Sequence, residues 1–151
     1  MLRIYLETTV FNRFLENNRE YYSDTKGLFE KIFHNEIEAY SSTYVIEELD
    51  RANEPKRTEM LSLIKKYNVT ILEIDQRAYD LSEIYIEMGI IPEKYRIDGI
   101  HIAMAAINNM DCIVSLNFRH INKLKTKMAT EIIHKMKGYC NPFICTPMEV
   151  I

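Results

Sequence analysis

Three acidic residues are spaced so that they could form one charged site. Glu7 directly follows a strand-like segment, Glu48 lies in the helical segment after a second one, and Asp98 opens an apolar helical segment. Carboxylates that converge without His or Cys partners are hard oxygen ligands, which suit Mg²⁺ or Mn²⁺ better than Zn²⁺. An ion held in this way activates a bound water for attack on a phosphodiester and stabilises the charge that develops. The three acids therefore predict a metal-dependent site for phosphodiester hydrolysis.

Helical geometry separates Glu48 from its neighbour Glu47. Val45 and Leu49 lie at −3 and +1 from Glu48, so the Glu48 side chain shares their inward stripe while Glu47 faces outward. A carboxylate on an apolar face costs free energy unless a cation or a metal partners it. An ion pair with a Lys or Arg is the alternative explanation for Glu48, and an interaction with the helix dipole is the alternative for Asp98.

The segments around these acids predict strands that alternate with helices. Strands are expected at residues 2–6, 38–41, 69–74, 112–116 and 142–145, and helices at residues 8–15, around 28–33, at 44–52, from 55 onward, and at 78–88, 97–109 and 119–137. We therefore expect an α/β fold, a three-layer α/β/α sandwich around a mainly parallel sheet of roughly five strands. Residues 1–151 are expected to form a single domain. In such sheets functional groups lie beyond the carboxyl ends of the strands, where the three acids fall.

Composition excludes several classes of protein. Apolar residues make up 47% and charged residues 27% of the 151 positions, which is typical of a soluble globular chain. The longest apolar run, residues 102–107, is too short to span a bilayer, and strand-like sequence from Leu2 leaves no room for a signal peptide. Four scattered glycines provide no phosphate-binding loop. We expect a protein without a membrane segment.

The three cysteines, at positions 112, 140 and 145, bear on the compartment of the protein. They are odd in number and lack CxxC spacing, which argues against a disulfide framework or a zinc site. Free cysteines fit a reducing environment. We therefore expect a cytoplasmic location.

Charge is distributed unevenly along the chain. The net charge is −3, yet residues 119–137 contain six Lys or Arg and one acid, Glu131, so this segment carries +5 and the rest carries −8. Such a segment can contact a nucleic-acid backbone, or it can simply be a solvated helix face. The rings of Tyr5, Tyr21, Tyr22 and Tyr44 could stack on bases, although packing is the usual role of tyrosine.

Three histidines are assigned by their neighbours. His101 lies one turn after Asp98, where it is either a partner of the acidic site or, as we favour, a hydrogen-bonded core histidine. His34 and His134 have no acidic residues around them and are expected at the surface.

Five ordered segments resemble the motifs of PIN-domain nucleases. They are the opening acidic signature IYLETTV at 4–10, the second motif VIEEL at 45–49, the third motif DGIHIAMA at 98–105, the fourth motif VSLNFRH at 114–120, and TPMEV at 146–150, which is similar to the tail of VapC-like toxins. The resemblance spans nearly the whole chain, and its strength lies in the order of the motifs.

The resemblance implies an Mg²⁺- or Mn²⁺-dependent ribonuclease of PIN fold that hydrolyses RNA, as the toxin of a toxin–antitoxin pair. Carried over by position, the metal ligands would be Glu7, Glu48 and Asp98, and Asn117 would complete the catalytic set. Residues expected to support the first acid or to contact substrate are Thr9, Ser115, Arg119 and His120. The implied partners are RNA, a small antitoxin protein and a second copy in a homodimer.

Two positions depart from the family pattern. Glu7 replaces the more usual aspartate, and Asn117 replaces the usual fourth aspartate. Three carboxylates leave one negative charge after one divalent ion binds, so we expect one firmly held ion and a second recruited by RNA. The alternative is a catalytically weak PIN-like module that binds RNA or a protein partner. A phosphatase with an aspartyl nucleophile ranks low, because it needs Asp where Glu7 stands.

Overall fold

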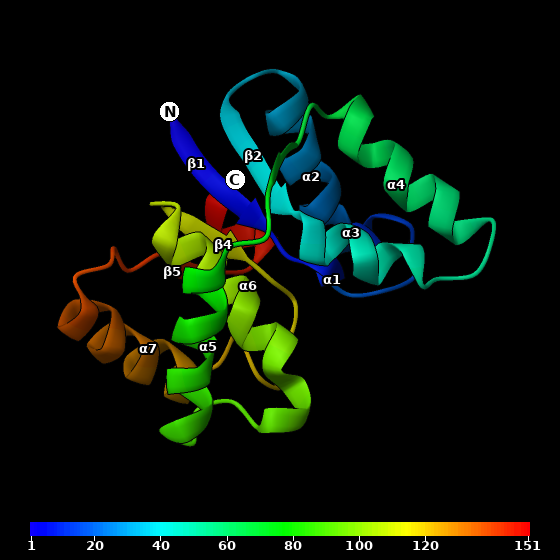
Figure 1. Ribbon diagram of the computed structural model, residues 1–151. Coiled ribbons are helices and arrows are strands. Elements are labelled where there is room, and N and C mark those ends of the chain that lie inside the picture. Colours follow the sequence, from blue (N-terminus) through cyan, green and yellow to red (C-terminus); the bar gives the residue numbers. More distant parts are fainter.

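The computed structural model describes all 151 residues, in which helices cover both faces of a five-stranded parallel sheet (Figure 1). The strands are β1 (Leu2–Leu6), β2 (Ile37–Ser42), β3 (Thr70–Leu72), β4 (Cys112–Val114) and β5 (Phe143–Cys145). They lie in the order β3-β2-β1-β4-β5, and each neighbouring pair is parallel. The expected α/β sandwich is confirmed.

The helices form two groups on opposite sides of the sheet. The first group contains α1 (Thr8–Phe14), α2 (Tyr22–Phe33), α3 (Thr43–Asp50) and α4 (Lys56–Lys66), and the second contains α5 (Gln76–Glu87), α6 (Arg96–Ile107) and α7 (Leu124–Lys137). Two short 3₁₀ helices are η1 (Glu93–Tyr95) and η2 (Pro147–Val150). Along the chain, β2 and β3 are added on one side of β1, and β4 and β5 are added on its other side. Right-handed crossovers therefore place the two groups on different faces.

One core of 37 buried hydrophobic residues connects the sheet to both helix layers. The α6 helix is enclosed almost completely, since every residue from Asp98 to Ile107 is buried. Gly99 allows its close packing on α5, because a Cβ at this position would lie only 3.2 Å from the Tyr85 ring. Asp98 is thus carried by a helix that is almost completely buried.

Several expected elements are shorter than predicted: the strand expected at 112–116 ends at Val114, and two other elements differ more. The strand expected at 69–74 is reduced to β3, which lies at the sheet edge and is only partly buried, because it has a neighbouring strand on one side alone. The helix expected at 119–137 begins at Leu124. The residues before it form turns, in which the Asn117 carbonyl accepts hydrogen bonds from the amides of Ile121 and Asn122. These turns close the loop after β4.

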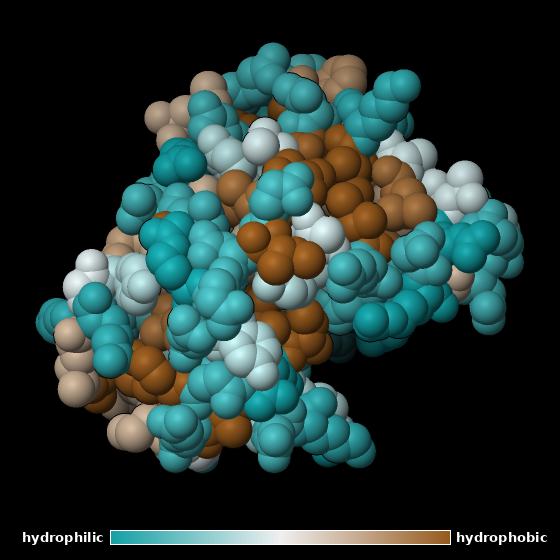
Figure 2. Space-filling view, viewed as in Figure 1, coloured by the Kyte–Doolittle hydropathy of each residue, from teal (hydrophilic) through white to brown (hydrophobic).

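The α7 helix presents its apolar side chains to solvent. Its exposed residues include Leu124, Met128, Ile132 and Met136, while its buried residues are Thr126, Thr130, Ile133 and His134. Figure 2 shows apolar side chains at the surface over this part of the molecule. The buried threonine hydroxyls of α7 are hydrogen-bonded within the protein. Thr126 Oγ1 donates to the His120 carbonyl at 2.8 Å, and Thr130 Oγ1 donates to the Thr126 carbonyl at 2.7 Å.

The expectation that His134 lies at the surface is wrong. Its side chain is fully buried between α5 and α7, where the Tyr85 hydroxyl bonds to Nε2 at 2.5 Å and Nδ1 bonds to Asn141 Oδ1 at 2.8 Å. Both ring nitrogens are satisfied, so burial of this polar ring is tolerated. His34, in contrast, is exposed as expected. None of the helices combines the length and the apolar character that crossing a bilayer requires.

Candidate active site

The three acids lie at the carboxyl edge of the sheet, around the point where the strand order reverses. Glu7 follows β1, Glu48 is on α3 after β2, and Asp98 is on α6 before β4. The strands on either side of the reversal are β1 and β4, and open α/β sheets bind ligands at the carboxyl ends of such a pair. The molecular surface is concave between α3 and the start of α6 (Figure 2). The fold therefore brings all three acids to one functional edge.

Two hydroxyl groups hold Glu7 in a buried position. Glu7 is 2% exposed, and its Oε1 accepts hydrogen bonds from Ser115 Oγ at 2.7 Å and Thr9 Oγ1 at 2.5 Å. Each hydroxyl is oriented in turn by the loop after β4: the Asn117 amide donates to Ser115 Oγ at 3.0 Å, and the Leu116 amide donates to Thr9 Oγ1 at 2.8 Å. The expected contact of Thr9 with the first acid is present, and Ser115 shares it.

Glu48 ends a buried hydrogen-bonded chain. Its Oε1 bonds to Thr8 Oγ1 at 2.7 Å and to His101 Nε2 at 2.6 Å. The other ring nitrogen of His101 bonds to the Tyr5 hydroxyl at 2.8 Å, and this hydroxyl bonds to Ser42 Oγ at 2.7 Å. Because His101 is fully buried and bonded at both nitrogens, the interpretation as a hydrogen-bonded core histidine is confirmed, and the same residue also orients Glu48.

Asp98 contacts the fourth motif. Its Oδ2 bonds to His120 Nδ1 at 3.0 Å, and the His120 ring packs on Tyr95 with centroids 4.1 Å apart. The His120 amide donates to Asn117 Oδ1 at 3.0 Å. His120 is therefore buried beside the acid, whereas Arg119 is exposed, with its guanidinium carbon 5.9 Å from the Tyr95 ring centroid.

The acids share one electrostatic environment. Burial raises the pKa of Glu7 and of Asp98, and the negative charge of Glu48 adds to both increases, although nearby donors and His101 oppose them. Burial also acts to raise the pKa of Glu48, but the hydrogen bond and charge of His101 outweigh it, and this pKa is lowered. Burial lowers the pKa of His101, yet Glu48 and the other acids raise it more, so the net change is upward.

No Lys or Arg forms a salt bridge with any of the three acids, which rules out the alternative of an ion pair for Glu48. Their ionic partners are histidines: His101 for Glu48 and His120 for Asp98. The bonds to Glu7 and Glu48 all go to Oε1, which leaves Oε2 of each without a protein donor. Neither oxygen is sealed off, since Thr146 Oγ1 is the one fully buried side-chain oxygen or nitrogen that lacks a partner.

The fit of a divalent cation rests on donor chemistry. No three His, Cys, Asp or Glu side chains are grouped so that they could hold a metal ion among them. The residues at the site nevertheless suit Mg²⁺ or Mn²⁺, because they provide carboxylate oxygens, an amide oxygen and free Oε2 atoms without a competing Lys or Arg. The position and the ligand types fit the ion, while the side chains are turned toward their hydrogen-bond partners.

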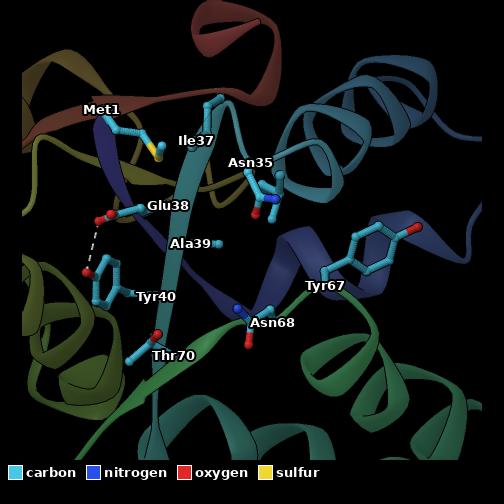
Figure 3. A pocket seen from close by; sticks show the side chains of 10 residues that line it. Met1, Asn35, Ile37, Glu38, Ala39, Tyr40, Tyr67, Asn68 and Thr70 are labelled. Atoms are coloured by element: carbon cyan, nitrogen blue, oxygen red, sulfur yellow. Dashed lines mark hydrogen bonds between the residues drawn. The ribbon is translucent and has the colours of Figure 1, made fainter.

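A second hollow lies at the opposite end of the sheet. This cavity of about 400 Å³ is lined by residues at or before the first positions of three strands, including Met1, Ile37 and Thr70 (Figure 3). Tyr40 and Glu38 face it from β2 and are joined by a hydrogen bond of 3.1 Å. None of the residues expected to do chemistry lines it, so the acidic edge remains the candidate site.

Several residues of the site were not predicted. Thr8 bonds to Glu48, Tyr95 packs on His120, and Ser42 bonds to the Tyr5 hydroxyl that contacts His101. Thr8 stands beside Thr9, and a hydroxyl in the first turn of a helix that begins at a strand end is a signal that could have identified it. The packing role expected by default for tyrosine is confirmed at Tyr5, whose ring is fully buried and whose hydroxyl bonds to His101, so this ring cannot stack on a base.

Comparison with solved structures identifies the fold. No family model and no curated protein matches the chain. The structure of VapBC2 from Rickettsia felis, bound to a DNA fragment from their promoter, aligns with a TM-score of 0.61 and 14% identity over 96% of this chain and 98% of that one. VapC20 of Mycobacterium tuberculosis, a sarcin-ricin loop cleaving toxin, aligns with a TM-score of 0.52 and 12% identity over 78% and 92%. The ordered motifs and this likeness agree, and the chain has the PIN-like fold of the VapC toxins.

Proposed function

We propose that this protein is an Mg²⁺- or Mn²⁺-dependent endoribonuclease and the toxin of a toxin–antitoxin pair. The observation that supports the proposal is the position of Glu7, Glu48 and Asp98 at one edge of the sheet, where the charge of Glu48 acts on both other acids and no Lys or Arg is paired to any of them. The likeness in fold to VapC structures supports it, since one of these is a toxin that cleaves the sarcin-ricin loop.

Each residue of the site has a role in this proposal. Glu7, Glu48 and Asp98 would bind the ion through carboxylate oxygens, and the amide of Asn117 would occupy the fourth position. When bound, the ion supplies a water of lowered pKa and positive charge at the scissile phosphate. Because the three carboxylates carry −3 in total, one ion is held firmly and RNA recruits any second one.

The protein prepares these ligands without help from substrate. Ser115 and Thr9 fix one oxygen of Glu7 and leave the other free. His101 keeps Glu48 ionised, because its hydrogen bond and charge lower the pKa of that carboxyl. The raised pKa values of Glu7 and Asp98 mean that protons compete with a cation there, so affinity for the ion increases with pH.

The decisive test compares cleavage of single-stranded RNA by the wild type and by conservative variants. Asp98→Asn and Glu48→Gln should each lower the Mg²⁺-dependent rate by at least about 100-fold, because a charged ligand is lost. Glu47→Gln is the matched control, since Glu47 is the exposed neighbour on the same helix and should leave the rate unchanged. Cleavage that persists in both site variants, or that resists EDTA, contradicts the proposal.

A second candidate is a catalytically weak module of the same fold that binds RNA or a protein. It is favoured by the absence of three grouped ligands and by the histidine bonds already made to Glu48 and Asp98. Calorimetric titration with Mn²⁺ separates the two candidates. Binding that fails at millimolar Mn²⁺, in a chain that still binds RNA, favours the module over the nuclease.

The proposal includes partners and a setting. Residues 1–151 act as a single cytoplasmic domain, which the three free cysteines support. We propose a small antitoxin protein and a second copy of this chain as its assembly partners, and the exposed apolar side chains of α7 support an assembly. Light scattering of the chain alone should give twice its mass of 17.9 kDa. A monomeric mass would remove the homodimer from the proposal.

A further inference from the structure

A cavity of about 410 Å³ shares the loop after β4 with the acidic site. It is lined by Arg13, Asn18, Arg19, Glu20, Tyr21, Leu116 and Phe118. Leu116 and Phe118 flank Asn117 in the loop after β4, the loop that also supplies Ser115 to Glu7. The other wall comes from α1 and the connection to α2. The loop therefore connects the cavity to Glu7: Leu116 lines the cavity, and its amide donates to Thr9 Oγ1, which is a hydrogen-bond partner of Glu7.

An aromatic pair faces this cavity. The rings of Tyr21 and Phe118 have centroids 5.5 Å apart and planes inclined by 38°. Phe118 is 44% exposed, although neighbouring Leu116 is buried. The Phe118 ring is not buried in the core. Because it is exposed beside a polar site, it is available to contact a ligand.

Tyr21 is held in an unusual conformation. Its φ of 65° and ψ of 7° are left-handed values, which are rare for a bulky side chain. The backbone around it is fixed, because the Tyr21 carbonyl accepts both the Thr25 amide at 2.9 Å and Thr25 Oγ1 at 2.7 Å. Strained backbone that is fixed in this way tends to occur at binding sites.

Two arginines complete the lining. Arg13 and Arg19 both contact the Glu16 carboxylate, at 3.4 and 3.2 Å, and Arg13 also donates to the Glu20 carbonyl. The Glu16 carboxylate is thus the shared ionic partner of two guanidinium groups, and the Arg19 side chain is 59% exposed. Aromatic rings together with guanidinium groups are the combination that binds bases of single-stranded nucleic acids, by stacking and by contacts to phosphate.

We propose that this cavity binds a nucleobase of single-stranded RNA, adjacent to the phosphate at the acidic site. The base stacks on Phe118 and Tyr21, and Arg19 contacts the backbone. This inference rests on the proposed ribonuclease function and adds a substrate subsite to it. A peptide would also find apolar contacts here, but the position beside a site for phosphodiester chemistry favours RNA, and the test below separates base stacking from contact with phosphate alone.

The chain contains no tryptophan, which makes a direct test possible. Phe118→Trp introduces a single fluorescent reporter and keeps an aromatic face. It is combined with Glu48→Gln, so that RNA binds without being cut, and is titrated with a short RNA and with an abasic strand of the same length. We expect the RNA to quench the fluorescence and the abasic strand to leave it unchanged. Equal quenching by both strands, or none by either, overturns the proposal.

A matched reporter controls for non-specific contact. Phe33 is the last residue of α2, is 55% exposed, and lies at the opposite end of that helix from Tyr21. Phe33→Trp in the same Glu48→Gln background should show no quenching by RNA. Quenching as strong as that at position 118 would mean that RNA has no preference for the cavity, and would overturn the assignment.

Cleavage kinetics separate this inference from the proposed function. Phe118→Leu keeps the apolar bulk and removes the aromatic face, so it should raise KM by about 5-fold or more and leave kcat nearly unchanged. Unchanged KM in an active Phe118→Leu variant overturns the subsite and leaves the nuclease intact. If the wild type binds RNA and cuts none, the quenching titration still tests the subsite while the ribonuclease proposal fails.

Discussion

Glu7 is enclosed by protein, with one oxygen bound to Ser115 and Thr9 and the other without a donor. Its pKa is raised mainly by burial. A carboxyl group whose pKa is higher in the folded than in the unfolded state loses stabilising free energy as pH rises through that interval. At neutral pH the ionised side chain therefore destabilises the fold until a cation compensates it, which is a common cost of a binding site.

Glu7→Gln should accordingly be more stable than the wild type at pH 7 in EDTA. Glutamine keeps an oxygen that can accept both hydroxyl hydrogen bonds and removes the buried charge. We expect Tm to rise by about 2–4 °C, the shift that roughly 1 kcal/mol produces in a chain of this size. Thermal unfolding followed by circular dichroism measures it, with exposed Glu47→Gln as the control. A lower Tm in Glu7→Gln would show that the charge stabilises the fold.

His134 provides a second test at the level of one residue. Burial lowers its pKa, and the bond to Asn141 opposes this only in part. Because this pKa is lower in the folded than in the unfolded state, neutral His134 contributes its full stability above about pH 6.5. This contribution is lost as pH falls through the pKa of His134 in the folded state. His134→Gln should therefore lose less unfolding free energy than the wild type between pH 7.5 and 5.5, measured with urea. An equal loss contradicts this, and exposed His34→Gln should behave as the wild type does.

Which site residues could be predicted follows from how each is positioned. Glu7, Glu48 and Asp98 were identifiable because strand ends and helical phase depend on local sequence. Thr8 had a local signal in its position at a strand end, but the contact of Tyr95 with His120 depends on how separate elements pack together. His134 was misplaced for the same reason, because its partners Tyr85 and Asn141 are brought to it by tertiary structure.

At the scale of elements, α7 shows that sequence pattern and burial can disagree. The order of strands and helices could be predicted from periodicity, but nothing local indicated that threonines would face the core while leucine and methionine face solvent. The start of α7 and the extent of β3 also depend on tertiary context, since turns after Asn117 and the edge position of β3 determine them.

Neighbouring isoleucines test the orientation of α7. Ile132 is 60% exposed and Ile133 is 5% exposed. Ile133→Ala should lower the free energy of unfolding by about 2–4 kcal/mol, because a buried side chain is removed. Ile132→Ala should change it by less than about 0.5 kcal/mol. Urea denaturation of both variants gives the comparison, and similar losses would mean that the helix is rotated about its axis.

The lysines of α7 form two separate groups. The helix follows β4, so Lys123, just before the helix, and Lys125 and Lys127 in its first turns lie near the acidic edge, while Lys135 and Lys137 lie at its far end. Fourteen residues at 1.5 Å each span about 20 Å, which separates the two groups. The positive segment seen in the sequence is thus divided by the structure, and under the proposed function only its first half would meet RNA at the site.

Replacing one pair from each group by alanine tests this division. Loss of Lys123 and Lys125 should weaken RNA binding and reduce the slope of log affinity against log salt by about 1.4, near 0.7 for each phosphate contact. The Lys135 and Lys137 double variant removes the same charge and should keep the slope. Fluorescence anisotropy in the Glu48→Gln background measures both. Equal effects would indicate general attraction in place of local contacts.

At the scale of the whole molecule, the acids join parts of the chain that are far apart in sequence. Glu7 follows β1, Glu48 belongs to the first helix group and Asp98 to the second. A cation bound by all three would therefore stabilise the folded state as a whole, by about 2.7 kcal/mol at a concentration 100 times its Kd. The overall layout was predictable because alternating strands and helices leave few possible topologies.

This coupling predicts that Mn²⁺ raises the Tm of the wild type and leaves that of Asp98→Asn nearly unchanged. Differential scanning fluorimetry across a Mn²⁺ series, with EDTA as the baseline, measures both. An increase of equal size in the two proteins would place the bound Mn²⁺ elsewhere.

The enclosure of α6 has a consequence for selectivity among ions. Asp98 sits on a helix with no room to shift, whereas Glu48 projects from α3, whose outer side faces water. If the site binds an ion as proposed, adjustment to a larger or smaller ionic radius would fall on Glu48, because the helix that carries Asp98 is enclosed. Discrimination between Mg²⁺ and Mn²⁺ would then depend on how far Glu48 can turn away from Thr8 and His101, to which its Oε1 is bonded.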